Sequence, residues 1–129
     1  VFAMMDGKQR KMALLGKSRG ERGTKTVALS GKKHGLPGIP VSELSSDQKG
    51  QVRKTMADLL AMFREKDAKE ALKMVDAGGF EHLHLAFYKN HDVGNDKIWD
   101  VWQIEGPNCL WFFRGDPHVH AWVNIKRAM

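Results

Sequence analysis

The sequence predicts an α+β domain in which N-terminal helices, including a helical hairpin, pack on a four-stranded antiparallel sheet. Apolar residues recur at helical spacing up to Gly79, and from Phe80 onward they alternate with polar residues, which is the period of a strand. The turns between the predicted strands are short, and short connections make neighbouring strands antiparallel. A chain of 129 residues with 42% hydrophobic residues can bury one core, so we expect a single domain over residues 1–129.

The first part of the domain, residues 1–40, is predicted to be a basic helix followed by an irregular loop. Asp6 and Gln9 form the pattern of a capping box, so we expect a helix over 3–15. Glycine and proline then interrupt any regular element before residue 40, although a short strand fits 24–29.

Residues 41–78 are predicted to form the helical hairpin. Ser45 and Gln48 make a second capping box ahead of a regular apolar stripe. We expect Asp67 to cap the second helix and Gly78-Gly79 to end it.

The sheet region, residues 80–126, contains four predicted strands. They are expected at 80–89, 97–105, 109–114 and 118–125. On the first and the last of these strands, aliphatic side chains share one side and histidines share the other. We therefore expect the hairpin to cover the aliphatic side and to leave the histidines on a second face.

Two His-x-His pairs are the strongest chemical signal: His82 with His84, and His118 with His120. Alternate strand residues point to one face about 7 Å apart, from which two imidazoles can converge on one ion. The pattern predicts a transition-metal site holding Zn, Cu, Ni or Fe. In a simple meander the two pairs lie roughly 14 Å apart, so one ion shared by all four histidines needs a curled sheet or adjacent outer strands.

A single pair needs a further ligand, and we expect Glu105, His91 or His34 as an additional ligand or as an acid or base. Arg114 is the candidate for binding an anion. The catalytic residues are not specified by any motif, and a hydrolytic or oxidative reaction would depend on the metal. The other interpretation is that the histidines are hydrogen-bonded structural or surface residues and that no cofactor is bound.

Basic charge is concentrated near the N-terminus. Residues 1–34 hold nine Lys or Arg and two acidic residues, whereas the rest of the chain is nearly neutral. This basic N-terminal lobe suits a protein partner or an anionic surface. Aromatic residues are not interleaved with the basic ones, so the pattern does not favour nucleic acid. The alternative function is therefore a non-catalytic protein-interaction or structural domain.

No apolar run approaches the roughly 20 residues that cross a bilayer, and no signal-peptide pattern is present, so we expect a soluble protein without a membrane span.

Cys109 is the only cysteine, which excludes an internal disulfide, and its neighbours predict a buried apolar role. The chain begins with Val1 rather than Met, which indicates a fragment of a longer chain, a processed form or an excised domain.

One family resemblance rests on the run 35–48, the helical pair after it and the motif W-x-W-x-x-E-G within 99–106. Over most of the chain from residue 35 onward, this order resembles the C-terminal part of an uncharacterised bacterial family, domain of unknown function 3500. Many members of that family have two histidines directly after the Glu-Gly of this motif, whereas this chain has Pro107 and Asn108 there. Its segment 114–120 resembles the same segment in a subgroup of the family, in which the histidines lie one strand later. The resemblance implies bacterial origin and, for many members, export, but no established activity.

Overall fold

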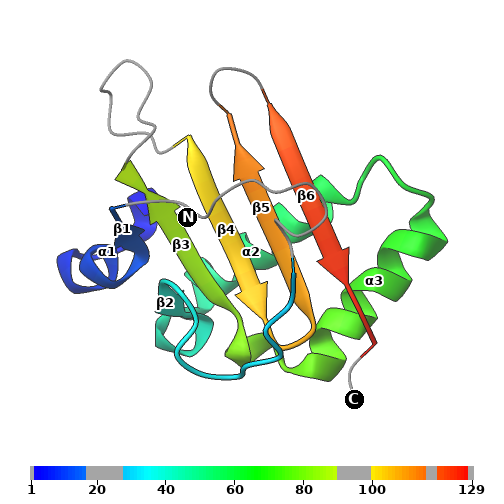
Figure 1. Ribbon diagram of the computed structural model, residues 1–129, viewed down its shortest axis with the longest axis horizontal. Coiled ribbons are helices and arrows are strands. Elements are labelled where there is room, and N and C mark those ends of the chain that lie inside the picture. The colour runs from blue at the N-terminus through cyan, green and yellow to red at the C-terminus, as the bar shows by residue number, and fades with distance from the viewer. Residues whose placement is uncertain (1, 17–27, 90–99, 116–118, 128–129) are drawn as a thin grey trace.

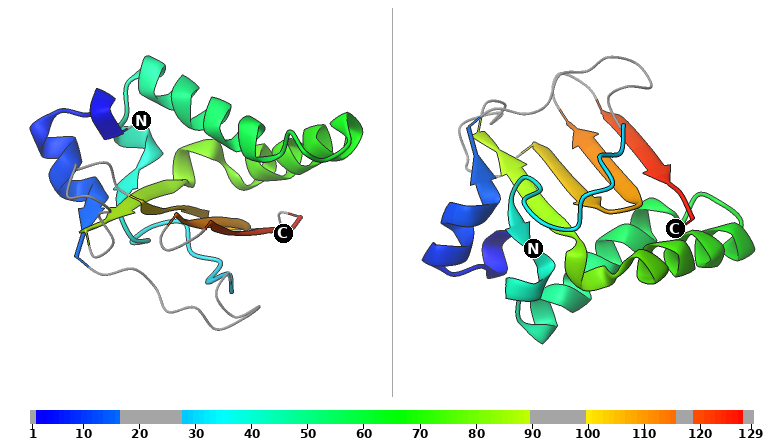
Figure 2. Two further views of the ribbon diagram at one scale, coloured as in Figure 1. Left: turned by 90° about the horizontal axis from the view of Figure 1, so that it is seen from above. Right: turned by 60° about the horizontal axis from the view of Figure 1, so that its bottom comes forward.

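The computed structural model describes residues 2–16, 28–89, 100–115 and 119–127. These residues form an α+β domain, as the sequence predicts, with three α-helices and a mixed sheet (Figure 1). The elements in chain order are α1 (Gly7–Ala13), β1 (Leu14–Leu15), β2 (Ile39–Pro40), α2 (Ser46–Leu59), α3 (Glu65–Gly78), β3 (His84–Tyr88), β4 (Val101–Gly106), β5 (Cys109–Arg114) and β6 (His120–Ile125). Figure 2 shows α2 and α3 on one face of the sheet; the opposite face, called the open face below, carries none of the described helices.

The sheet is larger than predicted and is not purely antiparallel. Strands β3, β4, β5 and β6 form the expected antiparallel meander in that order. Two short strands add to the outer edge of β3: β1 runs parallel to it, with Leu14 beside Phe87, and β2 runs antiparallel, with Ile39 beside Leu85. Each contains only two residues, too few for an alternating pattern to reveal, and they pair there because the backbone groups of a sheet edge need partners.

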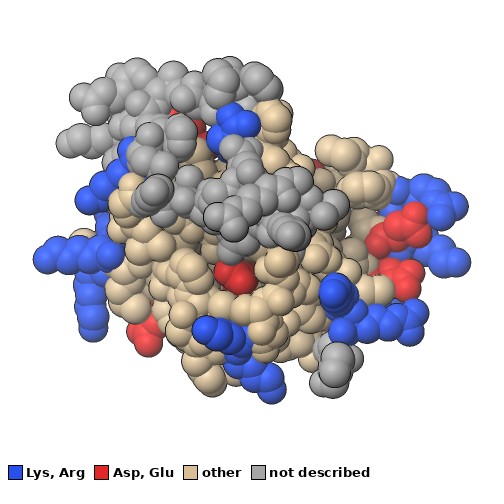
Figure 3. All heavy atoms as spheres, in the orientation of Figure 1, with Lys and Arg blue, Asp and Glu red and all other residues tan. Residues whose placement is uncertain are grey.

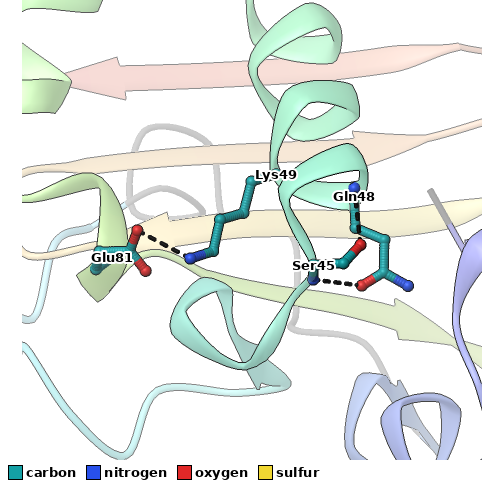
Figure 4. A network of polar contacts seen from close by, with 4 residues as sticks. All are labelled: Ser45, Gln48, Lys49 and Glu81. Atoms are coloured by element: carbon teal, nitrogen blue, oxygen red, sulfur yellow. Dashed lines mark hydrogen bonds and ion pairs between the residues drawn. The ribbon is translucent and has the colours of Figure 1, made fainter.

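Both predicted capping boxes are present. Asp6 caps α1 together with Gln9, and Ser45 caps α2 together with Gln48, where the Ser45 N–H donates to Gln48 Oε1 at 2.8 Å (Figure 4). The Gln9 and Gln48 amides also bond to each other at 3.0 Å, so the two helix starts are tied together. The buried Gln48 further donates to the carbonyl oxygen of Met4 at 2.7 Å.

Several predicted boundaries were wrong. The helix expected over 3–15 is split, because a 3-10 helix occupies Phe2–Met4 and Leu14–Leu15 joins the sheet. The second hairpin helix begins at Glu65, and Asp67 does not cap it but accepts a hydrogen bond from Arg64 Nε at 2.9 Å. Helix α3 ends at Gly78 and Gly79 follows it with a φ of +101°, in agreement with the predicted stop at Gly78-Gly79.

Strand β5 has the predicted bounds, whereas the other three predicted strands begin later than expected. The first opens as a 3-10 helix over Phe80–His82, because the His82 N–H donates to the Gly79 carbonyl, and β3 starts only at His84. Strand β4 begins at Val101 and β6 at His120. Residues 97–99 and 118, and most of the strand expected at 24–29, lie outside the described residues.

Apolar side chains pack on both faces of the sheet. The larger cluster lies between the sheet and the hairpin and includes Val52, Met56, Val75, Ile104 and Trp111. A smaller cluster lies on the open face and consists of Ala86, Tyr88, Val101, Leu110 and Phe112, with Leu15, Leu29 and Trp122 packed against it. Leu29 belongs to residues 28–38, called the crossing segment below, which run along the open face before β2 (Figure 2).

Within the described residues, no helix has both the length and the apolar composition needed to cross a membrane.

Candidate functional site

Polar side chains form part of the open face, as the alternation in the sequence predicts. The strand register places His84 opposite Glu105, and Arg114 opposite His120. Between these two pairs, Gln103 lies opposite Ala86 on one side and Phe112 on the other. His84, Gln103 and Glu105 are all buried, so this face holds ionisable and amide groups that are shielded from water.

Three histidines meet at one corner of this face, and we call them the histidine corner: His34, His82 and His84. His84 opens β3, His82 ends the preceding 3-10 helix, and His34 comes from the crossing segment. The rings of His34 and His82 are perpendicular, with centroids 5.4 Å apart. His82 packs so closely on Gly79 that a Cβ there would lie 2.6 Å from its Cδ2, so this arrangement requires glycine.

His84 is held in one orientation and one protonation state. Its Nδ1 lies 2.9 Å from the carbonyl oxygen of His82. Since a carbonyl only accepts, Nδ1 carries the proton and Nε2 keeps a lone pair. Burial lowers the pKa of His84 from 6.5, and the nearby His34 and His82 lower it further, while the hydrogen bond to the His82 carbonyl opposes them. The imidazole is therefore neutral at pH 7.

Glu105 supplies a carboxylate next to this corner. Its side chain is 3% exposed, and Gln103 Nε2 donates to its Oε1 at 3.2 Å. Burial and the charge of Glu105 raise the pKa of Cys109 to about 12, against a smaller lowering by a hydrogen bond to the backbone of Gly106. Cys109 is fully buried, so its thiol stays protonated and packs as an apolar side chain, as predicted.

The second predicted pair is not close to the first. His120 lies at the start of β6, where its ring stacks on Trp122 with centroids 5.4 Å apart; His118 lies outside the described residues. Strands β4 and β5 separate β3 from β6, and His84 and His120 occupy opposite corners, which places them roughly 19 Å apart at ordinary strand spacings. The structure therefore does not bring His84 and His120 to one ion.

The other predicted site residues are distributed over the two corners. Glu105 lies beside the histidine corner, and His34 belongs to it. Arg114 is half-buried beside His120 and opposite Val101 on β4. His91 lies outside the described residues.

As the side chains stand, no three His, Cys, Asp or Glu residues within the described ranges are arranged to enclose a metal ion.

Gln103 was missed by the sequence reasoning. Its position between Val101 and Glu105 at a spacing of two was the signal that would have placed it on the same face.

Comparison of the chain with protein-family models, with curated proteins and with solved structures finds no match.

Proposed function

We propose that this domain binds a transition-metal ion at the histidine corner, through His34, His82 and His84, with Glu105 as the nearest carboxylate. One observation carries the proposal: His34 from the crossing segment meets His82, which ends the 3-10 helix before β3, and His84, which begins β3. This set replaces the four-histidine site expected from the two His-x-His pairs.

The state of His84 supports this role. Histidines that bind metals usually donate their second ring N–H to a carbonyl or carboxylate, which fixes the ring and leaves the other nitrogen for the ion. His84 makes such a bond with the His82 carbonyl. Its lowered pKa also favours the neutral form that a metal requires.

The spacing of His34 and His82 also supports the proposal. Two imidazoles bound to a tetrahedral ion at about 2.0–2.1 Å have ring centroids roughly 5 Å apart, close to the 5.4 Å between these two rings. His34 is exposed, so its ring can turn toward Nε2 of His84 at little cost. Because some reorientation is needed, we expect an affinity on the order of micromolar rather than nanomolar.

Neutral imidazoles suit Zn, Cu, Ni and Fe. An ion held by three protein ligands keeps a position for water, and the hydrolytic or oxidative chemistry expected from the sequence would follow from that position. The resemblance to the uncharacterised bacterial family adds bacterial origin and export to the proposal.

Calorimetric titration of tag-free, chelator-stripped protein with Zn²⁺ tests the proposal, with Cu²⁺ electron paramagnetic resonance as a readout of nitrogen ligands. We expect about one ion per chain, and at least a tenfold weaker Kd, about 1.4 kcal/mol, in His34→Ala and His84→Asn. His34 is exposed, so its replacement leaves the fold intact and keeps the test valid even if His84→Asn unfolds.

The double variant His118→Ala with His120→Ala is the matched control, because it removes the same number of imidazoles from the other predicted pair. It should bind as the wild type does. The proposal fails if no ion binds more tightly than about 1 mM, or if the control variant loses binding while His34→Ala retains it.

The second candidate is the non-catalytic interaction domain. The observation that favours it is an exposed apolar surface beside β6, which includes Met62 at 84% exposure and Phe63 at 54%.

A further inference from the structure

Strand β6 is an edge strand without the features that usually protect an edge. In the described part of the chain, its only strand neighbour is β5, and it forms the border of the sheet in Figure 1. Its six residues contain no Asp, Glu, Lys, Arg or Pro. Edge strands normally carry charges, proline or a bulge that prevent pairing with another chain. An uncharged edge of this length is therefore suited to pairing.

An apolar groove lies beside β6 on the helix-covered face. It has a volume of about 290 Å³ and is lined by Met62 and Phe63 from the turn between α2 and α3, and by Trp111 and Phe113 of β5 together with Ala121 and Val123 of β6. A second hollow of about 250 Å³ shares Phe63 and Val123 with it and extends the apolar lining to Ile125. The sheet edge and the groove therefore form one continuous surface.

We propose that this surface binds a second copy of the chain, with β6 pairing antiparallel to its counterpart. A two-fold axis through such a pair keeps the helices of both copies on the same side of the joined sheet. The two grooves then adjoin across the new strand pair. The residues that each copy exposes there, Met62, Phe63 and Val123, are of the kind that the other copy's groove can bury.

The distribution of charge favours self-association through this edge. The chain carries a net charge of +6, and Figure 3 shows Lys and Arg side chains without many acidic neighbours along the side where α1 lies, next to the outer edge of β3, whereas on the opposite side Lys and Arg are interspersed with Asp and Glu. In the antiparallel dimer the two β3 strands are seven strand spacings apart, roughly 34 Å. This far exceeds the Debye length of about 8 Å at physiological salt, so the basic regions do not repel one another appreciably.

Charges near β6 also select the antiparallel arrangement. Lys126 and Arg127 follow directly after the strand and are exposed. A parallel pair would place these cations side by side, whereas an antiparallel pair places them at opposite ends. Between these ends the six residues of β6 include no Asp, Glu, Lys or Arg, so an identical partner with the same apolar pattern meets no like charge along the strand.

Sedimentation equilibrium in chelator, over a concentration series up to about 0.5 mM, tests the proposal independently of metal binding. We expect the mass to rise from 14.6 kDa toward twice that value. Val123→Lys places a charge on the edge at a site that is already 41% exposed, and should weaken dimerisation at least tenfold without lowering the urea midpoint. Ala121→Lys, also at an exposed site of β6, is a second variant for the same effect.

Met4→Lys is the matched control, because Met4 is 45% exposed and belongs to the N-terminal 3-10 helix, far from β6. This variant should dimerise as the wild type does. A wild type that stays monomeric over the whole series overturns the proposal, as does a Val123→Lys variant that still dimerises or a Met4→Lys variant that is equally impaired.

Discussion

Gly38 allows the crossing segment to pass close to β3 directly before β2 begins. Its φ is +97°, which side-chain-bearing residues rarely adopt, and a Cβ there would meet the Leu85 carbonyl oxygen, with the Leu85 carbonyl carbon at 2.6 Å and the Ala86 Cα at 2.9 Å. These are backbone atoms of β3, so they cannot move without disturbing the strand pairing. Gly38→Ala is therefore expected to be strongly destabilising.

The size of the effect can be estimated from its two parts. The left-handed backbone costs an alanine roughly 1–2 kcal/mol, and forcing an extra methyl group into a packed site costs roughly 1–3 kcal/mol. The free energy of unfolding should therefore fall by roughly 2–5 kcal/mol in urea denaturation. Because Gly38 lies close to His34 in the chain, the variant should also bind metal more weakly at the histidine corner.

Gly35→Ala is the matched control. Gly35 has a similar φ of +71°, but no atom lies within 4 Å of its would-be Cβ. This variant should lose only the backbone part, roughly 1–2 kcal/mol. If the two variants lose the same free energy of unfolding, close packing of Gly38 on β3 is not what makes this position special, and the reasoning is refuted.

Three further predictions concern buried polar groups. Gln48→Ala should lower the free energy of unfolding by roughly 2–4 kcal/mol in urea denaturation, because it removes the hydrogen bonds of this buried amide to Met4, Gln9 and Ser45. Ser45→Ala removes only a cap and should cost about 1 kcal/mol; equal losses would contradict this. The lowered pKa of His84 means that the unfolded chain binds more protons than the native chain between the native pKa and 6.5. Stability should therefore fall as pH drops through this range, and a His84→Gln variant with an unchanged pH dependence would count against it. With a pKa of about 12, the Cys109 thiol should not react with a disulfide reagent in native protein at about pH 8 but should react after denaturation; rapid native reaction would show that it is accessible.

The helix starts could be predicted because their determinants are local. A capping box needs only two residues three positions apart, and both Ser45 with Gln48 and Asp6 with Gln9 form one. The start of α3 was misplaced because Arg64 gives no side-chain cap, and Asp67 is a helical residue whose partner is Arg64. Where the sequence contains no capping signal, the helix boundary depends on packing that the pattern does not encode.

The additions to the sheet could not be predicted for a related reason. Leu14–Leu15 and Ile39–Pro40 pair with β3, yet neither has an alternating pattern of its own. Their partner is far away in the sequence, so their strand geometry is imposed by the edge of β3. Helical spacing alone favoured continuing the first helix through Leu15. In the structure, pairing with β3 instead holds Leu14 and Leu15 in a strand conformation.

The alternation of residues predicted which face of the sheet the histidines share, but whether they lie close together depends on the order of the strands. His84 and His120 both belong to the face opposite the helices, because residues two apart on a strand share a face. The meander then separates them by two intervening strands. His34 reaches His82 only because the crossing segment returns along the open face to form β2, a path that no periodicity in residues 28–38 reveals.

The order of the strands also keeps the two proposed surfaces apart. The histidine corner lies on the β3 side of the open face, whereas the apolar groove lies along β6 on the helix-covered face. Two rigid strands separate them, and dimerisation through β6 buries neither His34 nor His84. Energetic coupling between two sites requires an element whose conformation both of them change. The meander between β3 and β6 is a continuous hydrogen-bonded ladder with a single register, so metal binding and self-association should be independent properties of this domain.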